Sequence, residues 1–465
     1  MLPRLLFIIA LFSSTADADN PQTLRIDYYH SGNASMEMFS LDRLILEPLE
    51  FSGNLSQPED KTLRGKYVFE IVDPDSGKLA WSRSFSSIFG EWETTAEARS
   101  MNRTFHESLR LPQQEQEFDL ILKKRGPKNR FTEVWRIRVD PNDYLVHREH
   151  AAYAEHVVSI EHNGDSATKV DILLLGDGYT ENEQSEFLTK ARELTDLLFA
   201  TAPFSDRRSD FNVWALAPPA AKPGVSRPST GVYRDSPVGA SYDAFRSERY
   251  VLTNDNREWR RIASSTPYDF VEILTNSETY GGGGIYGLFS TAAANSEWAG
   301  YLFVHEFAHH FAGLADEYYT SSVAYESPEE IVEPYEPNVT ALLDPDNLKW
   351  RHLVSDATPL PTPWPKTAYE EHSLAYQVRR ANMRNENVSE KEMNSLFEEN
   401  QTVVEGLFSA APHADDVGAF EGAIYQSKGY YRSEQNCIMF TRTEDFCRVC
   451  AAAIEQVIDE YTGSR

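Results

Sequence analysis

The chain has 465 residues, of which 41% are hydrophobic and 12% aromatic, and its formal net charge is −28 at pH 7. This composition is typical of a globular protein and excludes a largely disordered one. The length predicts more than one domain. Because the charge is strongly negative, nucleic acid and anionic membranes are not expected as partners.

Residues 1–18 have the order of features that a secretory signal peptide requires. Arg4 precedes an apolar run from Leu5 to Phe12, and Ala16-Asp17-Ala18 forms a small-x-small cleavage pattern. The run is too short to cross a membrane, and no later apolar stretch approaches the length of a spanning helix. We therefore expect a secreted or periplasmic protein from which this signal peptide has been removed.

Residues 19–150 are predicted to form an all-β, sandwich-like domain. Short stretches with alternating apolar residues are separated by turn sequences, and they read TLRIDYYH (23–30), KYVFEIVD (66–73), EFDLILKK (117–124) and EVWRIRVD (133–140). Strands at such near-regular spacing favour a β-sandwich. Because no cluster of catalytic residue types occurs here, we interpret this region as an accessory domain.

In residues 151–465 the pattern changes to strands that alternate with helices, which predicts an α/β core. Thr180 and Glu183 form a capping box at the start of an apolar helical repeat that continues to Leu198. Strands are predicted at 170–175, 211–217 and 270–275, and further helices at 368–401 and 451–461.

Four successive glycines, Gly281 to Gly284, precede the next helical segment. Glycine allows backbone to approach a ligand closely or to adopt positive φ, which would suit a functional segment. The same run is equally typical of a flexible hairpin loop, so the sequence leaves both interpretations open.

The stretch VHEFAHHFAGLADEYY, residues 304–319, contains the central motif of the chain. His305 and His309 are four residues apart on a predicted helix that Ser296 would cap and that runs to about Ala312, so both imidazoles project from one face. This arrangement suits two ligands of a tetrahedral zinc ion. Glu306 would lie beside the metal and act as general base toward the attacking water.

A catalytic zinc needs a third protein ligand, and the spacing favours Asp316. In the extended zincin pattern a glycine ends the helix and the last ligand follows three residues later, as Asp316 follows Gly313 here. The helix contains one more residue before the glycine than the usual pattern. Glu317 is the competing ligand, whereas His310 is expected to face away.

The three cysteines, Cys437, Cys447 and Cys450, lie close together near the C-terminus, within CIMF…FCRVC. In an exported protein we rank one disulfide first, although the sequence does not say which pair would form it. Three thiols could also hold a structural metal, but no fourth ligand has convincing spacing. Met439, between these cysteines, could form an apolar turn beneath the zinc.

Taken together, HEFAHHFAGLADEYY, LLLGDGYT, YGGGGIYGLFSTA, GAFEGAIYQSKGYYR and CIMF…FCRVC resemble the IgA-protease-type family of secreted bacterial zinc endopeptidases. The resemblance runs from about Val170 to the C-terminus, and the leading β-region is similar to that family's N-terminal domain. It implies a metzincin-like zinc peptidase domain with a twisted mixed sheet, an active-site helix and a methionine turn.

The resemblance also implies roles for single residues. His305, His309 and Asp316 would bind one catalytic zinc ion, Glu306 would be the general base, and Met439 would be the turn methionine. The glycine-rich segment and the strand Ile285 to Ser290 would line the cleft and pair with an extended protein substrate. Some metzincins place an oxyanion-stabilising tyrosine where Thr441 stands, so that role would be vacant or would fall to Tyr430 or Tyr431.

The sequence therefore predicts an exported zinc metalloendopeptidase that hydrolyses peptide bonds of proteins. One alternative is an exported adhesion or binding protein whose peptidase domain is a non-catalytic, zinc-stabilised scaffold. Glu306 argues against it, because a structural zinc site needs no base. An amidase or deacetylase that acts on cell-wall or glycan substrates would share the zinc chemistry and would differ only in substrate.

Overall fold

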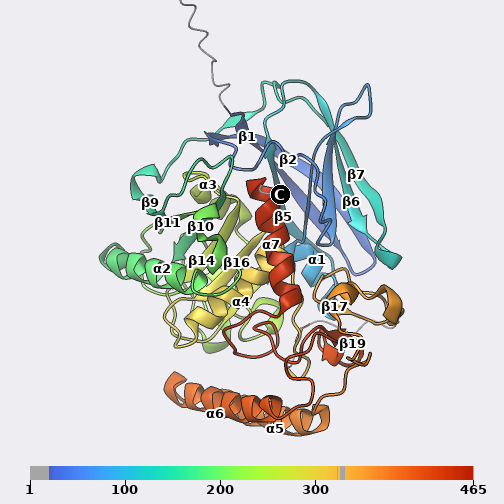
Figure 1. Ribbon diagram of the computed structural model, residues 1–465. Helices are drawn as coiled ribbons and strands as arrows, with labels where there is room; N and C mark the ends of the chain where they lie inside the picture. Colours follow the sequence, from blue (N-terminus) through green and yellow to red (C-terminus); the bar gives the residue numbers. More distant parts are fainter. Residues whose placement is uncertain (1–19, 322, 325–329, 464–465) are drawn as a thin grey trace, which may run out of the picture.

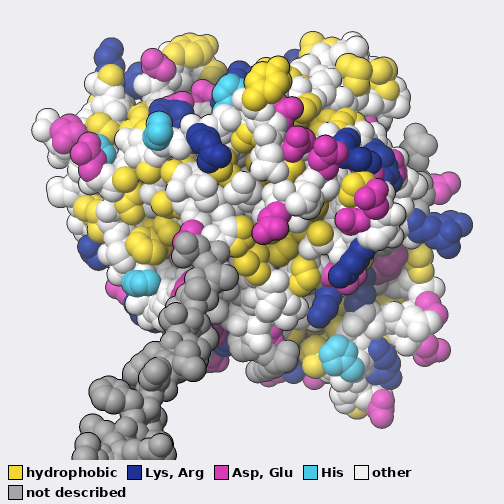
Figure 2. Space-filling model, turned by 90° about the horizontal axis from the view of Figure 1, so that it is seen from above, with side chains coloured by type: hydrophobic (Ala, Val, Ile, Leu, Met, Phe, Trp, Pro, Cys, Tyr) yellow, Lys and Arg dark blue, Asp and Glu magenta, His cyan; other side chains and the backbone are white. Residues whose placement is uncertain are grey.

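The computed structural model describes residues 20–321, 323–324 and 330–463, so the predicted signal peptide lies outside the described residues. It is a mixed α/β structure with several sheets and a β-rich N-terminal region (Figure 1). None of the described helices is long and apolar enough to cross a membrane. On the face shown in Figure 2, acidic and basic side chains are interspersed.

The N-terminal region consists of two four-stranded sheets, with strand orders β5-β1-β2-β8 and β4-β3-β6-β7. All four stretches predicted as strands are strands. The strands are β1 Gln22–Asn33, β2 Met36–Glu50, β3 Tyr67–Val72, β4 Leu79–Phe85, β5 Arg103–Pro112, β6 Phe118–Arg125, β7 Phe131–Val139 and β8 His147–Arg148. Alternate apolar residues such as Leu24, Ile26, Leu120 and Leu122 are buried in one shared core, as period-2 patterning requires.

A six-stranded sheet in the order β15-β16-β14-β10-β11-β9 forms the centre of the larger region. Its strands are β9 Val158–Glu161, β10 Val170–Asp177, β11 Phe211–Leu216, β14 Phe270–Thr275, β15 Gly282–Ile285 and β16 Phe289–Ala293. The four inner strands are parallel and both outer strands are antiparallel. β10 is buried along its whole length, which explains its continuous apolar sequence.

The strand expected to line the cleft is placed differently from the prediction. The edge of the sheet is β15, and Phe289 and Ser290 belong to β16, which lies between β15 and β14. The predicted segment Ile285 to Ser290 therefore contains a turn and the start of an inner strand, because the chain reverses at Gly287, whose φ is 69°.

Three helices that the sequence predicts pack around this sheet: α2 Gln184–Leu198, α4 Ala299–Ala312 and α7 Arg448–Thr462. The Thr180–Glu183 capping box is present before α2. Ser296 is not the N-cap of α4, because that position is Trp298. The Ser296 hydroxyl instead accepts from the Trp298 amide at 3.3 Å. The remaining helices are α1 Ile88–Trp92, α3 Asn256–Ala263, α5 Lys366–Asn385 and α6 Glu390–Ser409.

The helical pattern predicted at 368–401 corresponds to α5 and α6, which form a hairpin at the end of the molecule away from the β-rich region (Figure 1). Ser389 and Glu392 form a capping box that starts α6. The remaining short strands are β12 Ala240–Ser241, β13 Leu252–Thr253, β17 Val339–Thr340, β18 Phe420–Ala423 and β19 Gln426–Arg432.

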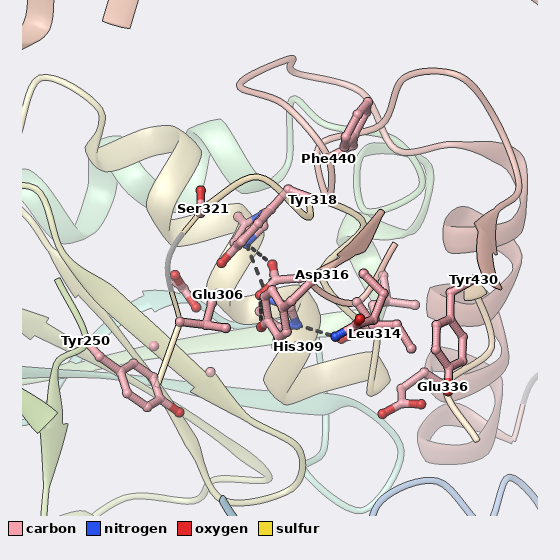
Figure 3. Close-up of a pocket in the computed structure, with 18 of the residues that line it drawn as sticks. Tyr250, Glu306, His309, Leu314, Asp316, Tyr318, Ser321, Glu336, Tyr430 and Phe440 are labelled. Atoms are coloured by element: carbon pink, nitrogen blue, oxygen red, sulfur yellow. Dashed lines mark hydrogen bonds and ion pairs between the residues drawn. The ribbon is translucent and has the colours of Figure 1, made fainter. Parts of the chain in front are cut away.

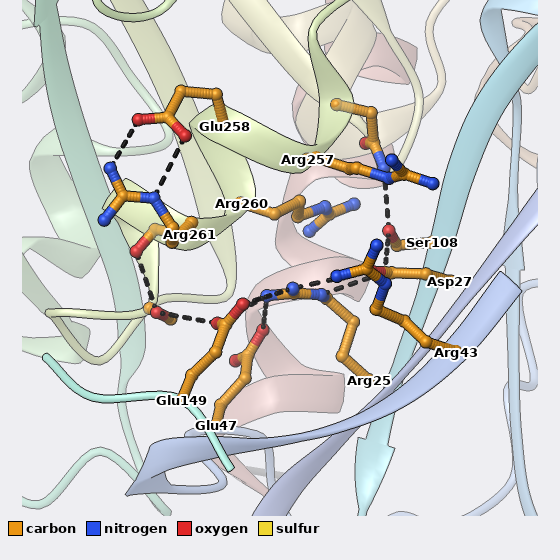
Figure 4. A network of polar contacts seen from close by, with 12 residues as sticks. Arg25, Asp27, Arg43, Glu47, Ser108, Glu149, Arg257, Glu258, Arg260 and Arg261 are labelled. Atoms are coloured by element: carbon orange, nitrogen blue, oxygen red, sulfur yellow. Dashed lines mark hydrogen bonds and ion pairs between the residues drawn. The ribbon is translucent and has the colours of Figure 1, made fainter. Parts of the chain in front are cut away.

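Buried polar contacts join the β-rich region to the central sheet. Arg25 contacts Asp27, Glu47 and Glu149 at 2.8–3.0 Å, the network drawn in Figure 4. Arg110 continues it by donating to the carbonyl of Tyr268, just before β14, at 2.8 Å. Residues of α1 and β5 also share a hydrophobic core with residues of β10, β14 and β16. The two regions are therefore packed together rather than merely tethered.

Arg64 connects the β-rich region directly to α4. It is buried, and its guanidinium donates to the carbonyls of Ala312 and Ala453 at 2.8 and 3.0 Å and to Gln456 at 2.7 Å. A cation at the C-terminal end of α4 also interacts favourably with the helix dipole.

We expect Arg64→Met to lower the free energy of unfolding by about 3 kcal/mol, because buried carbonyls lose a charged donor while the apolar stem is retained. Denaturant unfolding of the full chain measures this. The control is Lys61→Met, which changes an exposed cation in the same loop. Equal losses in the two variants would contradict a specific role for Arg64.

Candidate active site

Helix α4 presents two histidines and a glutamate to a cleft. Apolar residues such as Phe303, Phe307 and Phe311 bury the opposite side of the helix. His305 and His309, one turn apart, bring their Nε2 atoms to 3.2 Å from each other. His310 faces away as predicted, and its Nε2 accepts from the Val271 amide of β14 at 3.2 Å.

A left-handed turn at Gly313 returns the chain toward these histidines. Gly313 has φ 60° and ends α4, as the helix-stop signal predicted. Asp316 Oδ1 then lies 3.1 Å from His305 Nε2 and 3.2 Å from His309 Nε2 (Figure 3). The structure therefore brings Asp316, and not Glu317, together with the two histidines.

The hydrogen bonds of the two imidazoles fix which nitrogens are free to bind a metal. His305 Nδ1 lies 2.9 Å from the Ile438 carbonyl, and His309 Nδ1 lies 2.6 Å from the Leu314 carbonyl. Because carbonyl oxygens only accept, each Nδ1 carries the proton. The other nitrogen of each ring, Nε2, is the one directed toward the other histidine and toward the Asp316 carboxylate.

Three acceptors that face one another at this distance require positive charge between them. The pKa of His309 reflects this: burial opposes the charged ring, but the Asp316 carboxylate raises the pKa to about 9. The spacing also suits a metal, because ligand atoms 2.0–2.1 Å from zinc at a tetrahedral angle lie about 3.3 Å apart. The observed distances of 3.1–3.2 Å are compatible with such a ligand set.

Glu306 lies beside this ligand set and points into the same cleft (Figure 3). Its carboxylate is within 4.8 Å of the ligand nitrogens of His305 and His309. Burial raises the pKa of Glu306 above its ordinary value, against the opposing effect of the two histidines. A carboxylate with a raised pKa beside a candidate metal-ligand set is suited to exchange protons near neutral pH.

The four glycines of residues 281–284 are packed rather than flexible. A Cβ at Gly282 would lie 3.0 Å from Glu306 Cγ, and one at Gly284 would lie 2.3 Å from the Glu306 carbonyl oxygen. On the other face, Cβ atoms at Gly281 and Gly283 would lie 2.5 and 2.4 Å from tyrosine rings. The alternation follows the two faces of a strand, so β15 can approach α4 only because these residues lack side chains.

Met439 lies in a tight turn, as predicted, with the amides of Phe440 and Thr441 donating to the Cys437 carbonyl at 2.8 and 3.0 Å. The Met439 side chain is fully buried. The turn holds the site through its backbone, since Ile438 accepts from His305 and Met439 accepts from the Glu317 amide at 2.8 Å.

Tyr425 is a site residue that the sequence analysis missed. Its hydroxyl donates to Asp316 Oδ2 at 2.5 Å. It lies with Ile424 in a two-residue hairpin turn between β18 and β19, with φ values of 63° and 42°. Such turns favour Asn-Gly, and a β-branched residue at positive φ is strained. Strain in this turn is the signal that could have found Tyr425, but it becomes visible only once the turn type is known.

The two tyrosines considered from the sequence do not approach the histidines. Tyr430 lines the cleft, but its hydroxyl accepts from the Val332 amide at 3.3 Å, and it lies apart from His309 in Figure 3. Tyr431 pairs with Thr340 in a neighbouring strand. Tyr318 also lines the cleft, and its hydroxyl accepts from the guanidinium of Arg249 at 3.1 Å.

The ranking of a disulfide first among the cysteines was wrong. All three thiols are free, and Cys437 Sγ and Cys450 Sγ are 3.8 Å apart. The fourth partner that the sequence did not identify is Glu317, whose side chain turns away from Asp316 and joins the three sulfurs. Adjacent residues along an extended segment point in opposite directions, which separates Asp316 from Glu317.

The cleft has a volume of about 860 Å³. It is lined by the β-rich region at Lys66 and Arg125, by β15, by α4 and by the α5–α6 hairpin at Tyr376 and Gln401. The N-terminal region therefore forms one wall of the cleft, through Lys66 and Arg125.

Comparisons with known proteins agree with this architecture. Residues 158–458 match the family model described as IgA Peptidase M64, and residues 16–136 match that of the Peptidase M64 N-terminus. A search of curated proteins found no match. The first family match alone spans more than half of the chain and includes the histidines, Glu306, Asp316 and Met439. The chain therefore belongs to the IgA peptidase M64 family and is a peptidase.

Proposed function

We propose that this peptidase is an exported, metzincin-like zinc metalloendopeptidase. The observation that carries the proposal is the convergence of His305 Nε2, His309 Nε2 and Asp316 Oδ1 within 3.2 Å of one another. The carbonyls that orient both imidazoles are the outer partners that metal-bound histidines require. When bound there, a zinc ion supplies the Lewis acid that polarises the scissile carbonyl and lowers the pKa of the attacking water.

The residues around this ligand set have complementary roles. Glu306 takes the proton of the attacking water and returns it to the leaving amine. Asp316 completes the ligand set, and the Tyr425 hydroxyl fixes the orientation of its carboxylate. Arg249, held against Tyr318, is a fixed positive charge available to the negative charge that develops on the substrate carbonyl.

The substrate is a protein segment bound in an extended conformation. The cleft is lined by the β-rich region, β15, α4 and the α5–α6 hairpin, and β15 forms the edge of the sheet along it. Gly282 already exchanges backbone hydrogen bonds with Arg249 and Val251 on its outer side. Gly284, two residues further and oriented the same way, is the position at which an extended substrate adds to the edge.

The test combines protein cleavage with metal removal. Purified full-length protein should degrade denatured casein, lose this activity when zinc is chelated, and regain it when zinc is restored. His309→Ala should lose the zinc held at this site together with the activity. Cleavage that persists after zinc chelation and also in His309→Ala would exclude the zinc mechanism. Zinc binding without cleavage of any protein would favour the non-catalytic scaffold.

Export is proposed from residues 1–18 and is tested separately. Expression of the full chain in a bacterial host with an intact secretion pathway, followed by N-terminal sequencing, should give a mature protein that begins near Asp19. Retention of the first residues in a cytoplasmic product would contradict it.

We expect Tyr425→Phe to weaken zinc binding about 10–100-fold, because Asp316 loses the donor that orients it. Phenylalanine keeps the ring and the strained backbone, so the change isolates the hydroxyl. Competition with a chromophoric chelator measures the zinc Kd. Tyr431→Phe, on the adjoining strand β19, is the control and should leave the Kd unchanged.

A further inference from the structure

A second cluster of metal-ligating side chains lies behind the active site. Glu317, Cys437, Cys447 and Cys450 are each at most 3% exposed, and one ligand atom from each lies within 4.8 Å of those of the others. The cysteines come from the methionine turn and the start of α7, whereas Glu317 comes from the segment after α4. Three separate segments therefore meet at this cluster.

The spacing within the cluster is that of a tetrahedral ligand set. Sulfurs 2.3 Å from zinc at a tetrahedral angle lie about 3.8 Å apart, and a sulfur and a carboxylate oxygen lie about 3.5 Å apart. Cys437 Sγ and Cys450 Sγ are separated by 3.8 Å, and Cys450 Sγ and Glu317 Oε1 by 3.6 Å. Disulfide-bonded sulfurs would instead be about 2.0 Å apart.

One carboxylate oxygen of Glu317 also points to a bound cation. Its Oε1 accepts from Asn338 Nδ2 at 3.0 Å, but its Oε2 is buried without a hydrogen-bond partner in the described structure. The buried guanidinium of Arg432 donates instead to the carbonyls of Gly422 and Gln435. A carboxylate oxygen buried without a partner is costly unless a cation is bound to it.

The sulfurs are surrounded by donors that favour thiolates. Cys447 is the N-cap of α7, and its Sγ accepts from the Cys450 amide at 3.4 Å. Its own amide donates to Cys437 Sγ at 3.3 Å. A helix N-terminus and backbone amides stabilise negative charge on sulfur, as they do in metal-thiolate sites.

We propose that Glu317, Cys437, Cys447 and Cys450 form a second, closed metal site that binds one structural Zn²⁺ ion. Three thiolates and a carboxylate satisfy zinc's preference for four tetrahedral ligands and leave no open position for catalysis. The acidic pair after α4 therefore serves two sites, with Asp316 directed to one and Glu317 to the other.

The second ion has a positioning role toward the first site. Glu317 donates its amide to Met439, and Ile438, next to the ligand Cys437, accepts from His305 Nδ1. An ion that joins Glu317 to Cys437 therefore fixes the distance between Asp316 and the carbonyl that orients His305.

The test measures zinc content and zinc–sulfur coordination in the full-length protein. Wild type should contain about two zinc ions per chain, and X-ray absorption should show sulfur at about 2.3 Å from zinc. His309→Ala should keep one zinc ion. All zinc that remains should then show sulfur coordination, because the first site contains no sulfur. Glu317→Gln and Cys450→Ser should each lose one ion and the sulfur signal. Glu434→Gln, a carboxylate that contacts Arg448 outside the cluster, is the matched control and should keep both ions.

Two results would overturn the proposal. One is zinc without sulfur coordination in the wild type, whatever the activity. The other is an intact mass lower by one pair of hydrogens, which would show a disulfide. The wild-type spectrum decides the question even if a cysteine variant does not fold. Failure of the first site, seen as loss of the zinc bound by nitrogen and oxygen alone, would leave the sulfur signal in place.

Discussion

Glu306→Gln should lower kcat for protein cleavage by about 10²–10⁴-fold while the zinc content stays unchanged. Glutamine keeps the size of the side chain but cannot accept the proton of the attacking water. The three proposed ligand atoms belong to other residues, so the metal site is retained. Cleavage of denatured casein and metal analysis on the same samples measure the two effects.

The control for this substitution is Glu297→Gln, which makes the same change at an exposed position just before α4. It should leave both cleavage and zinc content at the wild-type level. If Glu306→Gln cleaves as fast as wild type, Glu306 is not the general base. If it loses zinc as well as activity, the carboxylate supports the metal site and the loss of activity says nothing about proton transfer.

The sequence predicted those parts of the fold and the site that depend on neighbours along the chain. The strands of the β-rich region and β10, β11 and β14 follow from apolar periodicity. His305 and His309 are brought together by helical geometry alone, and Gly313 supplies the turn that returns Asp316. Each of these inferences relates residues that are close along the chain, within the length of about four helical turns. Local backbone geometry determines how such residues are placed.

The parts that could not be predicted depend on pairings between distant segments. Tyr425 reaches Asp316 from a hairpin more than a hundred residues later, and no local pattern connects them. Glu317 was considered only as a competitor of Asp316, because its cysteine partners lie near the C-terminus. For the same reason the cysteines were predicted to form a disulfide, since Glu317 is distant from them in the sequence.

The glycine run shows how the structure resolves a question that the sequence left open. Both a flexible loop and a close backbone approach are compatible with four glycines. Added Cβ atoms would contact backbone and side-chain atoms of α4 on one face of β15 and tyrosine rings of a preceding segment on the other. The run is therefore needed to fit a strand against the active-site helix.

Gly284→Ala should lower the free energy of unfolding by about 1–3 kcal/mol, as overpacking of a well-packed interior does. The added Cβ would lie 2.3 Å from the Glu306 carbonyl oxygen and 2.8 Å from His309 Cβ, and neither belongs to the end of a flexible side chain. Strand β15 and α4 must therefore move apart. A displacement of about 1 Å at the catalytic groups is enough to lower activity by about 10²-fold.

Gly406→Ala is the matched control because Gly406 lies within α6 with open space around its Cβ position. Replacing a helical glycine by alanine should raise stability by up to about 1 kcal/mol and leave cleavage unchanged. Denaturant unfolding and casein cleavage of both variants separate the two effects of Gly284. Wild-type stability and activity in Gly284→Ala would mean that β15 does not need to contact α4. Wild-type stability with reduced cleavage would place the added methyl in the path of the substrate along the sheet edge.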